Sequence, residues 1–489
     1  MGARSGKEYL EGLRDDREIW LEGERVVDVT TDPRLRGAAT TLARIYDLHH
    51  AEPEVLLTED HGSGELVPVS HVIPRSREDL ERRRRALEAI ALLTLGWLGR
   101  SPDYVNVTMA GFAGREDVWR RNGDADGAKR LVEFQREAML ADWCMTHAIV
   151  NPTIDKSQRE VDAGDGAIAL HKVGESADGL VVSGSRALAT LAPFADEMVV
   201  YPGQPVPRDA NRYALSFSIP MATPGLRFLC RESFAARPGT EADHPFSSRF
   251  DEQDAFVVFD EVIVPWERVF LDGDTDVYNR AMTTGWVANI MQQTTVRAHV
   301  KLRFAWELAT RMAAAIGSDG PQVTEMLGEL WTYAELTRSV IEAAHVGAHD
   351  WGNGVWFCDD RPFRAIRPTL PRWFPRAAEI ITLLGAHSLL TTPSPAELAH
   401  PELRPLIDRY YQGANGMSAE ERIAIFRTAW DFTGSALAGR GELYERFYLA
   451  SSSRMFQVAQ AGAARDSAFD LVGPVIAEQI GGQGSVRSS

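Results

Sequence analysis

Cysteine is scarce in this chain of 489 residues, with only Cys144, Cys230 and Cys358, far apart and without a CxxC pair. This spacing argues against a disulfide framework and against a zinc site built on cysteine. Long apolar runs are also missing: the most apolar helix candidate, residues 86–99, is shorter than the roughly 20 residues of a membrane span. The charged segment 1–18 shows no apolar core of a signal peptide. We therefore expect a cytoplasmic protein that does not enter a membrane.

Positive charge is in deficit as well. Lys and Arg number 52 against 69 Asp and Glu, which gives a net charge of −17. An acidic surface of this size disfavours nucleic acid or an anionic membrane as a partner. The phosphate-binding GxxxxGK[ST] loop, a GxGxxG turn after a strand, HExxH and GxSxG are all absent. We expect no metal site, and a flavin, if one binds, would not use the Rossmann fingerprint.

Apolar periodicity divides the chain into three parts: a mostly helical domain over residues 1–145, a β domain over 146–275 and a helical domain over 276–489. Ser76 and Asp79 resemble a capping box that opens a long helix. Alternating apolar and small residues predict a half-buried strand over 213–219. Further helices are predicted over 128–143, 302–312, 332–345 and 376–390, further strands over 180–182, 198–201 and 256–264, and a frayed tail from Gly481. This order predicts an α+β fold but identifies no cofactor.

One candidate site segment is Gly-Arg-Ser-Pro-Asp-Tyr at residues 99–104. Pro102 suits the first turn of a helix, with Ser101 as its N-cap. Arg100 would then lie just before the helix and Tyr104 about one turn into it, where a cation and a phenolic donor can together hold an oxyanion or a phenolate. A surface arginine and a core tyrosine are the simpler interpretation of the segment taken alone.

Two further segments lie at or after the predicted domain junction. His147 stands among apolar residues, and an imidazole can take a phenol proton at neutral pH. A lone buried histidine is nevertheless more often structural. The small residues of segment 186–193, with one hydroxyl at Thr190, suit close approach of the backbone to a flat ring, although a plain loop is the simpler interpretation.

Together these segments resemble the family of 4-hydroxyphenylacetate 3-monooxygenase oxygenase components, over about Ser5 to Ala459. The most specific runs are Gly99–Tyr104, His147–Pro152, Leu191–Glu197, Ile219–Gly225, Phe250–Phe256 and Gly439–Phe447. The resemblance implies an acyl-CoA-dehydrogenase-like fold with an N-terminal helical domain, a middle β-barrel domain and a C-terminal four-helix bundle. It also implies a homotetramer, or a dimer of that kind, with the flavin in the cleft between domains near a neighbouring subunit.

The resemblance further implies a two-component, reduced-flavin-dependent phenol hydroxylase. A separate NADH-dependent reductase would supply FADH2, and one oxygen atom of O2 would go to the carbon ortho to the phenol hydroxyl. Arg100, Tyr104 and His147 look like the phenol-binding and catalytic positions. Thr190 resembles a position near the flavin N5 edge, and Asn151, Arg297 and Ser451 are weaker candidates for flavin contacts.

One departure concerns the substrate. Where the phenylacetate enzymes offer hydroxyl groups to the substrate carboxylate, this chain reads Val-Tyr-Pro-Gly-Gln-Pro-Val-Pro at residues 200–207, without a Ser-Thr pair. We therefore expect a different or larger phenol, such as a tyrosine derivative, a hydroxycinnamate or an aminoacyl group on a carrier protein.

Three alternatives stay open at this point. An acyl-CoA dehydrogenase would need a carboxylate base, which no recognised segment supplies. A 4-hydroxybutyryl-CoA dehydratase would need three cysteines and a histidine for an iron–sulfur cluster, and segment 100–104 has no cysteine. The third is a non-enzymatic flavin carrier or tetrameric scaffold.

Overall fold

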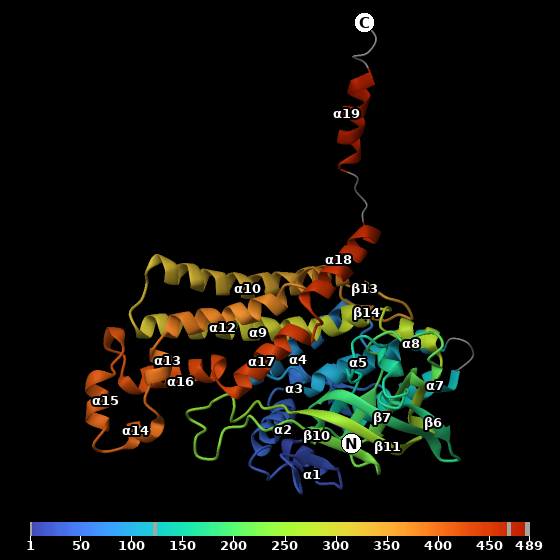
Figure 1. Ribbon diagram of the computed structural model, residues 1–489, viewed down its shortest axis with the longest axis horizontal. Coiled ribbons are helices and arrows are strands. Elements are labelled where there is room, and N and C mark those ends of the chain that lie inside the picture. The colour runs from blue at the N-terminus through green and yellow to red at the C-terminus, as the bar shows by residue number, and fades with distance from the viewer. Residues whose placement is uncertain (1, 121–124, 467–470, 485–489) are drawn as a thin grey trace.

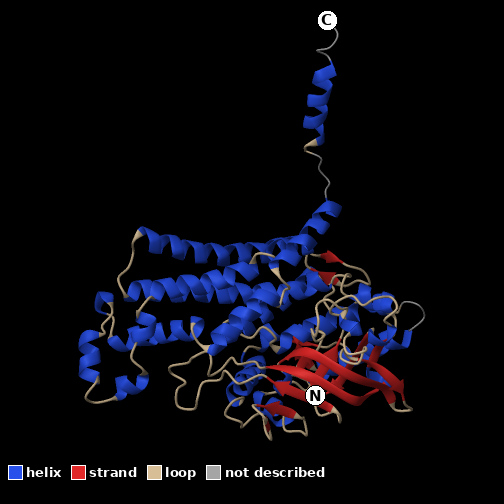
Figure 2. Cartoon of the chain, viewed as in Figure 1, coloured by secondary structure: helices blue, strands red, loops and turns tan. Residues whose placement is uncertain are grey.

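The computed structural model describes residues 2–120, 125–466 and 471–484. Long helices form one layer, and most of the β-strands lie beneath one end of it, surrounded by shorter helices (Figure 1; Figure 2). No helix among the described residues is long and apolar enough to cross a membrane. The arrangement is of the α+β kind that the order of patterns predicts.

The N-terminal part is mostly helical but contributes strands as well. Its helices are α1 (Gly6–Gly12), α2 (Arg36–Ala51), α3 (Pro53–Leu56), α4 (Arg77–Thr94), α5 (Pro102–Gly114), α6 (Glu116–Trp119) and α7 (Ala125–Ala141). Its strands are β1 (Ile19–Leu21), β2 (Glu24–Arg25), β3 (Leu57–Glu59) and β4 (Leu66–Pro68). The periodicity gave no sign of these short strands, and β1 and β2 extend the large sheet.

Helix α4 begins as predicted and ends earlier. The Ser76 hydroxyl accepts the Asp79 N–H at 3.1 Å, but the Asp79 carboxylate accepts the Arg75 N–H instead of that of Ser76. The predicted capping box is therefore only half formed. Leu95 and Gly96 both take left-handed backbone angles, with φ of 53° and 69°. This pair stops the helix at Thr94, so the apolar run 86–99 is not one helix.

The β-strands form a six-stranded sheet in the order β2-β1-β10-β11-β7-β6 and a four-stranded sheet in the order β12-β9-β8-β5. Their bounds are β5 (Met145–His147), β6 (His171–Glu175), β7 (Gly179–Thr190), β8 (Glu197–Val200), β9 (Leu215–Pro220), β10 (Leu226–Cys230), β11 (Asp254–Pro265) and β12 (Val269–Asp272). The predicted half-burial of β9 is wrong, because residues 215–219 are all buried. Its serine hydroxyls are satisfied inside the protein, by the Val200 carbonyl and the Glu197 carboxylate.

Strand β7 is longer than the pattern predicts and carries segment 186–190 within it, so the loop interpretation of that part is wrong. It pairs with β11 along its length and reaches Thr190 opposite Asp254. Leu191 then adopts a left-handed conformation, with φ of 70°, and a short 3-10 helix follows. The turn therefore leaves Thr190 at the end of the sheet.

The C-terminal part is built around α9, which is buried along most of its length and packs against α4, α5, α10 and α12. The helices are α8 (Thr275–Ala281), α9 (Trp286–Ala315), α10 (Pro321–Val346), α11 (Asp360–Ile366), α12 (Leu370–Gly385), α13 (Ser388–Thr391), α14 (Pro395–Ala399), α15 (Arg404–Tyr410), α16 (Ala419–Thr433), α17 (Ala436–Phe447), α18 (Ser452–Asp466) and α19 (Gly473–Gly484). A hairpin of β13 (His349–Asp350) and β14 (Trp356–Phe357) lies beside them.

Two predictions at this end need correction. The helix expected over 376–390 is interrupted, because the backbone of Ala386 leaves the helical region between α12 and α13. Residues 481–484 form the last turn of α19 rather than a frayed tail, and 485–489 lie outside the described residues. Helix α19 projects away from the body of the molecule (Figure 1).

Candidate functional site

A cavity of about 1010 Å³ lies where the ends of β7 and β11 face helix α17. This is the upper end of the usual size range of small-molecule sites. Apolar side chains make up most of its wall, among them Ile149, Val150, Leu188, Phe234 and Phe256. A few polar side chains converge on it from segments far apart in the sequence. Such a site can hold a flat ligand and fix its orientation through few contacts.

Helix α17 supplies one complete wall of the cavity. The lining positions follow the helical period and so lie on a single face: Ala436, Gly439, Arg440, Leu443, Tyr444 and Phe447. Leu443 and Phe447 are more than half exposed in this chain. The polar part of the wall, Arg440 and Tyr444, is partly buried, and the apolar part, Leu443 and Phe447, is open.

Arg100, Tyr104 and His147, the predicted phenol site, come together at the buried end of the cavity. Arg100 and His147 line it. Tyr104 is buried against both: the Arg100 guanidinium carbon lies 4.0 Å from the centre of the Tyr104 ring, and the Tyr104 and His147 rings are 5.5 Å apart. Pro102 opens α5 as expected, although the Ser101 side chain makes no capping hydrogen bond.

Arg100 is a fixed cation at this position. Its guanidinium donates to the Tyr444 hydroxyl at 2.7 Å and lies near the ring of Tyr448. Burial opposes the charge, but Tyr104, Tyr444 and Tyr201 outweigh it and raise the pKa of Arg100 above its ordinary value. The site therefore holds a permanent positive charge, suited to an anionic oxygen.

His147 is neutral in this environment. Burial, and then the Arg100 cation, hold the pKa of its imidazole well below the ordinary value of 6.5. Tyr201 Oη and His147 Nδ1 are 2.8 Å apart. Burial, with the neighbouring Tyr104, raises the pKa of Tyr201 well above 10, so Tyr201 keeps its proton. The other ring nitrogen, Nε2, is left to meet a ligand.

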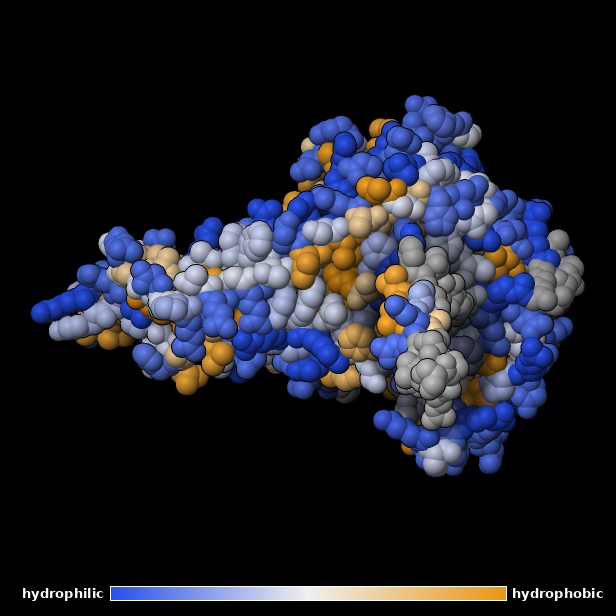
Figure 3. Space-filling model, turned by 90° about the horizontal axis from the view of Figure 1, so that it is seen from above, coloured by the Kyte–Doolittle hydropathy of each residue, from blue (hydrophilic) through white to orange (hydrophobic). Residues whose placement is uncertain are grey.

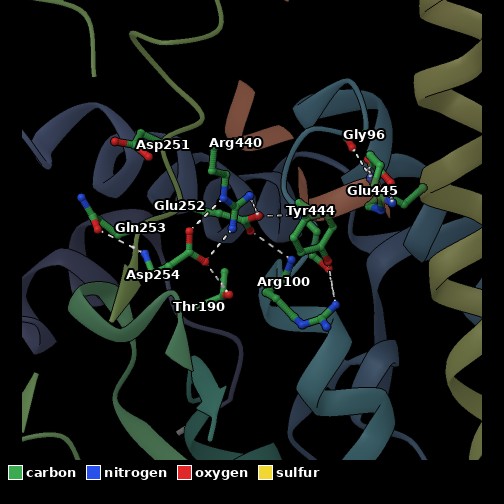
Figure 4. Close-up of polar contacts among 12 residues, drawn as sticks. Gly96, Arg100, Thr190, Asp251, Glu252, Gln253, Asp254, Arg440, Tyr444 and Glu445 are labelled. Atoms are coloured by element: carbon green, nitrogen blue, oxygen red, sulfur yellow. Dashed lines mark hydrogen bonds and ion pairs between the residues drawn. The ribbon is translucent and has the colours of Figure 1, made fainter. Parts of the chain in front are cut away.

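A buried charge network supports the same end of the cavity (Figure 4). Arg440 bridges two carboxylates, with 2.5 Å to Glu252 Oε1 and 2.7 Å to Asp254 Oδ1. Glu252 accepts the backbone N–H groups of Gly99 and Arg100, and so fixes the chain that carries Arg100. Burial opposes the charge of Asp254, but Arg440 and Arg231 hold its pKa below the ordinary value.

Thr190 lines the cavity at the end of β7. Its hydroxyl donates to Asp254 Oδ1 at 2.7 Å, and its carbonyl accepts from the Thr146 hydroxyl. Because its hydrogen is committed to Asp254, the Thr190 oxygen can act towards a ligand only as an acceptor.

The weaker flavin candidates lie elsewhere in this single chain. Asn151 bonds to Arg186 and Glu160. Arg297 makes a buried bidentate pair with Glu445 at 2.8 Å. Ser451 is exposed, just after α17. None of the three is among the described residues that line the cavity, and their contact with flavin stays a prediction.

Several residues of the site were not predicted: Tyr201, Glu252, Asp254, Arg440 and Tyr444. Four of them stand in runs that carry the family resemblance, 250–256 and 439–447. The available signals were the acidic residues between Phe250 and Phe256 and the arginine at position 440 in the second run. Tyr201 ends a predicted strand and lies in a segment noted for the hydroxyl groups it lacks, and neither feature indicates a site residue.

Models of the 4-hydroxyphenylacetate 3-hydroxylase N-terminal and C-terminal families match residues 5–271 and 278–475. The chain belongs to this family. It is 36% identical over 461 residues to the 4-hydroxyphenylacetate 3-monooxygenase oxygenase component of Thermus thermophilus, with 93% of each protein covered. It is also 36% identical to the 4-nitrophenol 2-monooxygenase oxygenase component of a Rhodococcus species, covering 91% of this chain and 85% of the relative.

Solved structures of the family confirm the expected fold. A 4-hydroxyphenylacetate 3-monooxygenase oxygenase component, crystallised with FAD and 4-hydroxyphenylacetate, superposes with a TM-score of 0.91, at 34% identity and 99% coverage of both chains. An archaeal 4-hydroxybutyryl-CoA dehydratase superposes with a TM-score of 0.84 at 20% identity, over 98% of this chain and 95% of its own. This second likeness shows a shared fold only.

The cysteines of this family member are not assembled into a ligand set. Cys144 packs near Tyr9 and Tyr46, Cys230 lines the cavity, and Cys358 is buried near Arg83. The described residues contain no group of three His, Cys, Asp or Glu side chains that could hold a metal ion. The three-cysteine site of the dehydratase alternative is therefore not formed by these residues.

Proposed function

We propose that this chain is the oxygenase component of a two-component monooxygenase that hydroxylates a phenol ortho to its hydroxyl group, with reduced FAD and O2. The observation that carries the proposal is the convergence of Arg100, Tyr104 and His147 at the buried end of one cavity. Family membership supports it, since relatives at 34–36% identity are named as phenol monooxygenases.

The cavity fits a reduced flavin beside a phenol. Bound reduced FAD would activate O2 and supply the oxygen atom that is transferred. Thr190 fits such a ligand because its oxygen, already donating to Asp254, is an acceptor for the N5–H that reduced flavin carries and oxidised flavin lacks. Arg231, partly exposed on the cavity wall, would face the anionic part of the cofactor. We propose Asn151, Arg297 and Ser451 as further flavin contacts. Where such a residue does not line the cavity of its own chain, the flavin it contacts would be bound by a neighbouring subunit.

The protein's own task is to ionise the phenol. Arg100 stabilises the phenolate, with Tyr104 beside it, and a phenolate is richer in electrons at the ortho carbon than a phenol. His147 takes the proton: it is neutral in the free protein, and a phenolate between it and Arg100 raises its affinity for the proton. Positioned acid–base groups of this kind contribute about 10²–10⁴-fold. The apolar wall excludes water from the reacting atoms.

The substrate we propose is a phenol other than 4-hydroxyphenylacetate. It either lacks the para carboxymethyl group or is larger than 4-hydroxyphenylacetate. The only side-chain hydroxyl in segment 200–207 is that of Tyr201, and it is engaged with His147. Three prolines in this segment lack an N–H, and the Val206 N–H donates to Asn279. One relative, from Streptomyces globisporus, is named for a substrate on a peptidyl carrier protein. Both a free phenol and a carrier-bound phenol therefore belong to the test.

The proposal also includes a homotetramer, a transient NADH-dependent flavin reductase and a cytoplasmic location. Apolar side chains gather on the helical face seen from above (Figure 3). Large exposed ones lie on α10 (Trp331, Leu336, Val346) and around α19 (Leu471, Val475, Ile480). Such surfaces support association. Sedimentation velocity tests the homotetramer. A monomer at micromolar concentration would overturn that part of the proposal.

The function is tested with the purified protein, FAD, a flavin reductase, NADH and a panel of phenols, by quantifying the catechol formed. We expect ortho-hydroxylation of at least one neutral para-substituted phenol, faster than that of 4-hydroxyphenylacetate. Equal rates on 4-hydroxyphenylacetate and every larger phenol would overturn the substrate part. Formation of the catechol by the His147→Asn or Arg100→Met variant at the wild-type rate would overturn the assignment of the site.

A further inference from the structure

The side chain of Tyr444 joins helix α17 to the proposed phenol site. Tyr444 lines the cavity, and its hydroxyl oxygen accepts an N–H of Arg100 at 2.7 Å (Figure 4). Its ring stacks on that of Tyr448, with ring centres 4.6 Å and planes 11° apart. The guanidinium carbon of Arg440 lies 4.8 Å from the centre of the same ring. These contacts hold the Tyr444 hydroxyl beside the cation of the site.

The direction of this hydrogen bond leaves the hydrogen of Tyr444 unused. A guanidinium can only donate, so the Tyr444 oxygen is the acceptor and its own hydrogen is directed elsewhere. Within residues 2–120, 125–466 and 471–484, no group accepts that hydrogen. Burial raises the pKa of Tyr444 well above 10, against the opposing effects of Arg100 and Arg297, so the hydroxyl keeps its hydrogen. Tyr444 is therefore a donor available to a ligand in the cavity.

Tyr448, one turn further along α17, offers a comparison within the same helix. Its hydroxyl also lines the cavity and also accepts from an arginine, but that arginine is Arg297, at 3.2 Å. Arg297 is paired with Glu445 and is not among the described residues that line the cavity. A ligand oxygen bound to Arg100 is therefore within reach of the hydroxyl of Tyr444, and the hydroxyl of Tyr448 is tied to a different cation.

We propose that Tyr444 is a further substrate-binding residue, which donates its hydrogen to the phenolate oxygen held by Arg100. The proposal rests on the proposed function, in which Arg100 stabilises a phenolate. An ionised oxygen carries no hydrogen and accepts from both groups at once. Hydrogen bonds to an ionised acceptor are also stronger than those to a neutral one. The N–H of Arg100 polarises the Tyr444 hydroxyl and so strengthens it as a donor. Tyr444 thereby stabilises the phenolate more than the phenol.

Binding of 4-nitrophenolate, followed by its visible absorbance, separates donation to the ligand from mere support of Arg100. In the full chain, Tyr444 is replaced by 3-fluorotyrosine, whose hydroxyl is a stronger donor and a weaker acceptor. If Tyr444 donates to the phenolate, the dissociation constant should fall. If it only accepts from Arg100, the dissociation constant should rise or stay the same, and either result would overturn the proposal. The same replacement of Tyr448 is the matched control and should leave the dissociation constant unchanged.

Tyr444→Phe removes the donor and keeps the ring. The affinity for 4-nitrophenolate should fall about 10-fold, as expected for a lost hydrogen bond to a charged group. The affinity for reduced FAD, measured without oxygen, should stay unchanged. Weaker binding of reduced FAD with unchanged binding of 4-nitrophenolate would overturn the proposal, because the hydrogen would then serve the flavin. A wild-type protein that does not bind 4-nitrophenolate would overturn it too. If the wild-type protein binds 4-nitrophenolate in this pattern but forms no catechol from any phenol, the proposed function fails and the donor role of Tyr444 stands.

Discussion

The guanidinium of Arg100 donates to the hydroxyl of Tyr444 at 2.7 Å, across 344 positions of the sequence. Arg100 precedes α5 in the N-terminal part, and Tyr444 lies on the cavity face of α17 near the C-terminus. The same helix carries Arg440, which through Glu252 also holds the backbone of Arg100. Helix α17 therefore sets both the position and the direction of the cation in the proposed phenol site.

Tyr444→Phe removes this hydrogen bond and keeps the ring. A hydrogen bond to a charged group contributes about 1.5–3 kcal/mol, and we expect kcat/KM for the phenol to fall about 10-fold. Tyr448→Phe is the matched control, since that hydroxyl bonds to Arg297 at 3.2 Å and not to Arg100. Steady-state catechol formation measures both. Equal losses in the two variants would contradict a specific role of Tyr444.

Arg440→Ala leaves the buried carboxylate of Glu252 and the partly buried carboxylate of Asp254 without their shared cation. Removing one partner of a buried ion pair costs about 3–5 kcal/mol. We therefore expect a large fall in the thermal unfolding midpoint. Arg440→Lys should have a midpoint between those of Arg440→Ala and the wild-type protein. Arg404→Ala, which breaks a surface pair with Asp408, should change the midpoint little. Similar midpoints for Arg440→Ala and Arg404→Ala would argue against the network in Figure 4.

Gly99→Ala tests how tightly α17 packs against the segment of Arg100. A Cβ atom at Gly99 would lie 2.0 Å from the Tyr444 hydroxyl oxygen, so Tyr444 must move. We expect turnover to fall about 10-fold or more, with a stability loss of about 1–3 kcal/mol. At Gly328, inside α10, an added Cβ meets nothing within 4 Å. Gly328→Ala should leave turnover unchanged and raise stability slightly. Wild-type turnover in Gly99→Ala would contradict the packing described.

Glu197 predicts a pH dependence of stability. Burial raises the pKa of its carboxyl to about 7, against the opposing effect of Arg268, from an ordinary value of 4.5. The folded state then binds more protons than the unfolded state between these values. This contribution is fully present below about pH 4.5 and is lost as pH rises through 7. Glu197→Gln should reduce the loss of stability between pH 5 and pH 8, measured by urea unfolding. Glu137→Gln, which removes a more distant charge that also pairs with Arg268, should reduce the loss much less.

The part of the site that the sequence predicts lies close together along the chain. Arg100 and Tyr104 flank one helix start, and proline at residue 102 marks that start, so local rules were enough. His147 was found because it stands at a change of periodicity. Glu252, Arg440 and Tyr444 meet Arg100 only through tertiary packing, and no spacing along the chain indicates which arginine pairs with which acid.

The errors in the fold have related causes. Strand β9 looks half-buried because serine alternates with apolar residues, but Ser216 and Ser218 find acceptors inside the protein. Segment 186–190 looks like a loop because its residues are small, but β11 supplies a pairing partner. The end of α4 depends on two left-handed residues, Leu95 and Gly96, of which only the glycine gives a signal in the sequence.

The central claim is that one oxygen atom of O2 enters a phenol in the cavity formed by Arg100, Tyr104 and His147. The most direct measurement supplies the protein with reduced FAD and 18O2 in the presence of a phenol, and determines the isotope content of the product by mass spectrometry. We predict a catechol carrying one 18O atom, and its loss in His147→Asn. Reoxidation of the flavin at its free rate, with hydrogen peroxide as the only product across the phenol panel, would contradict the account.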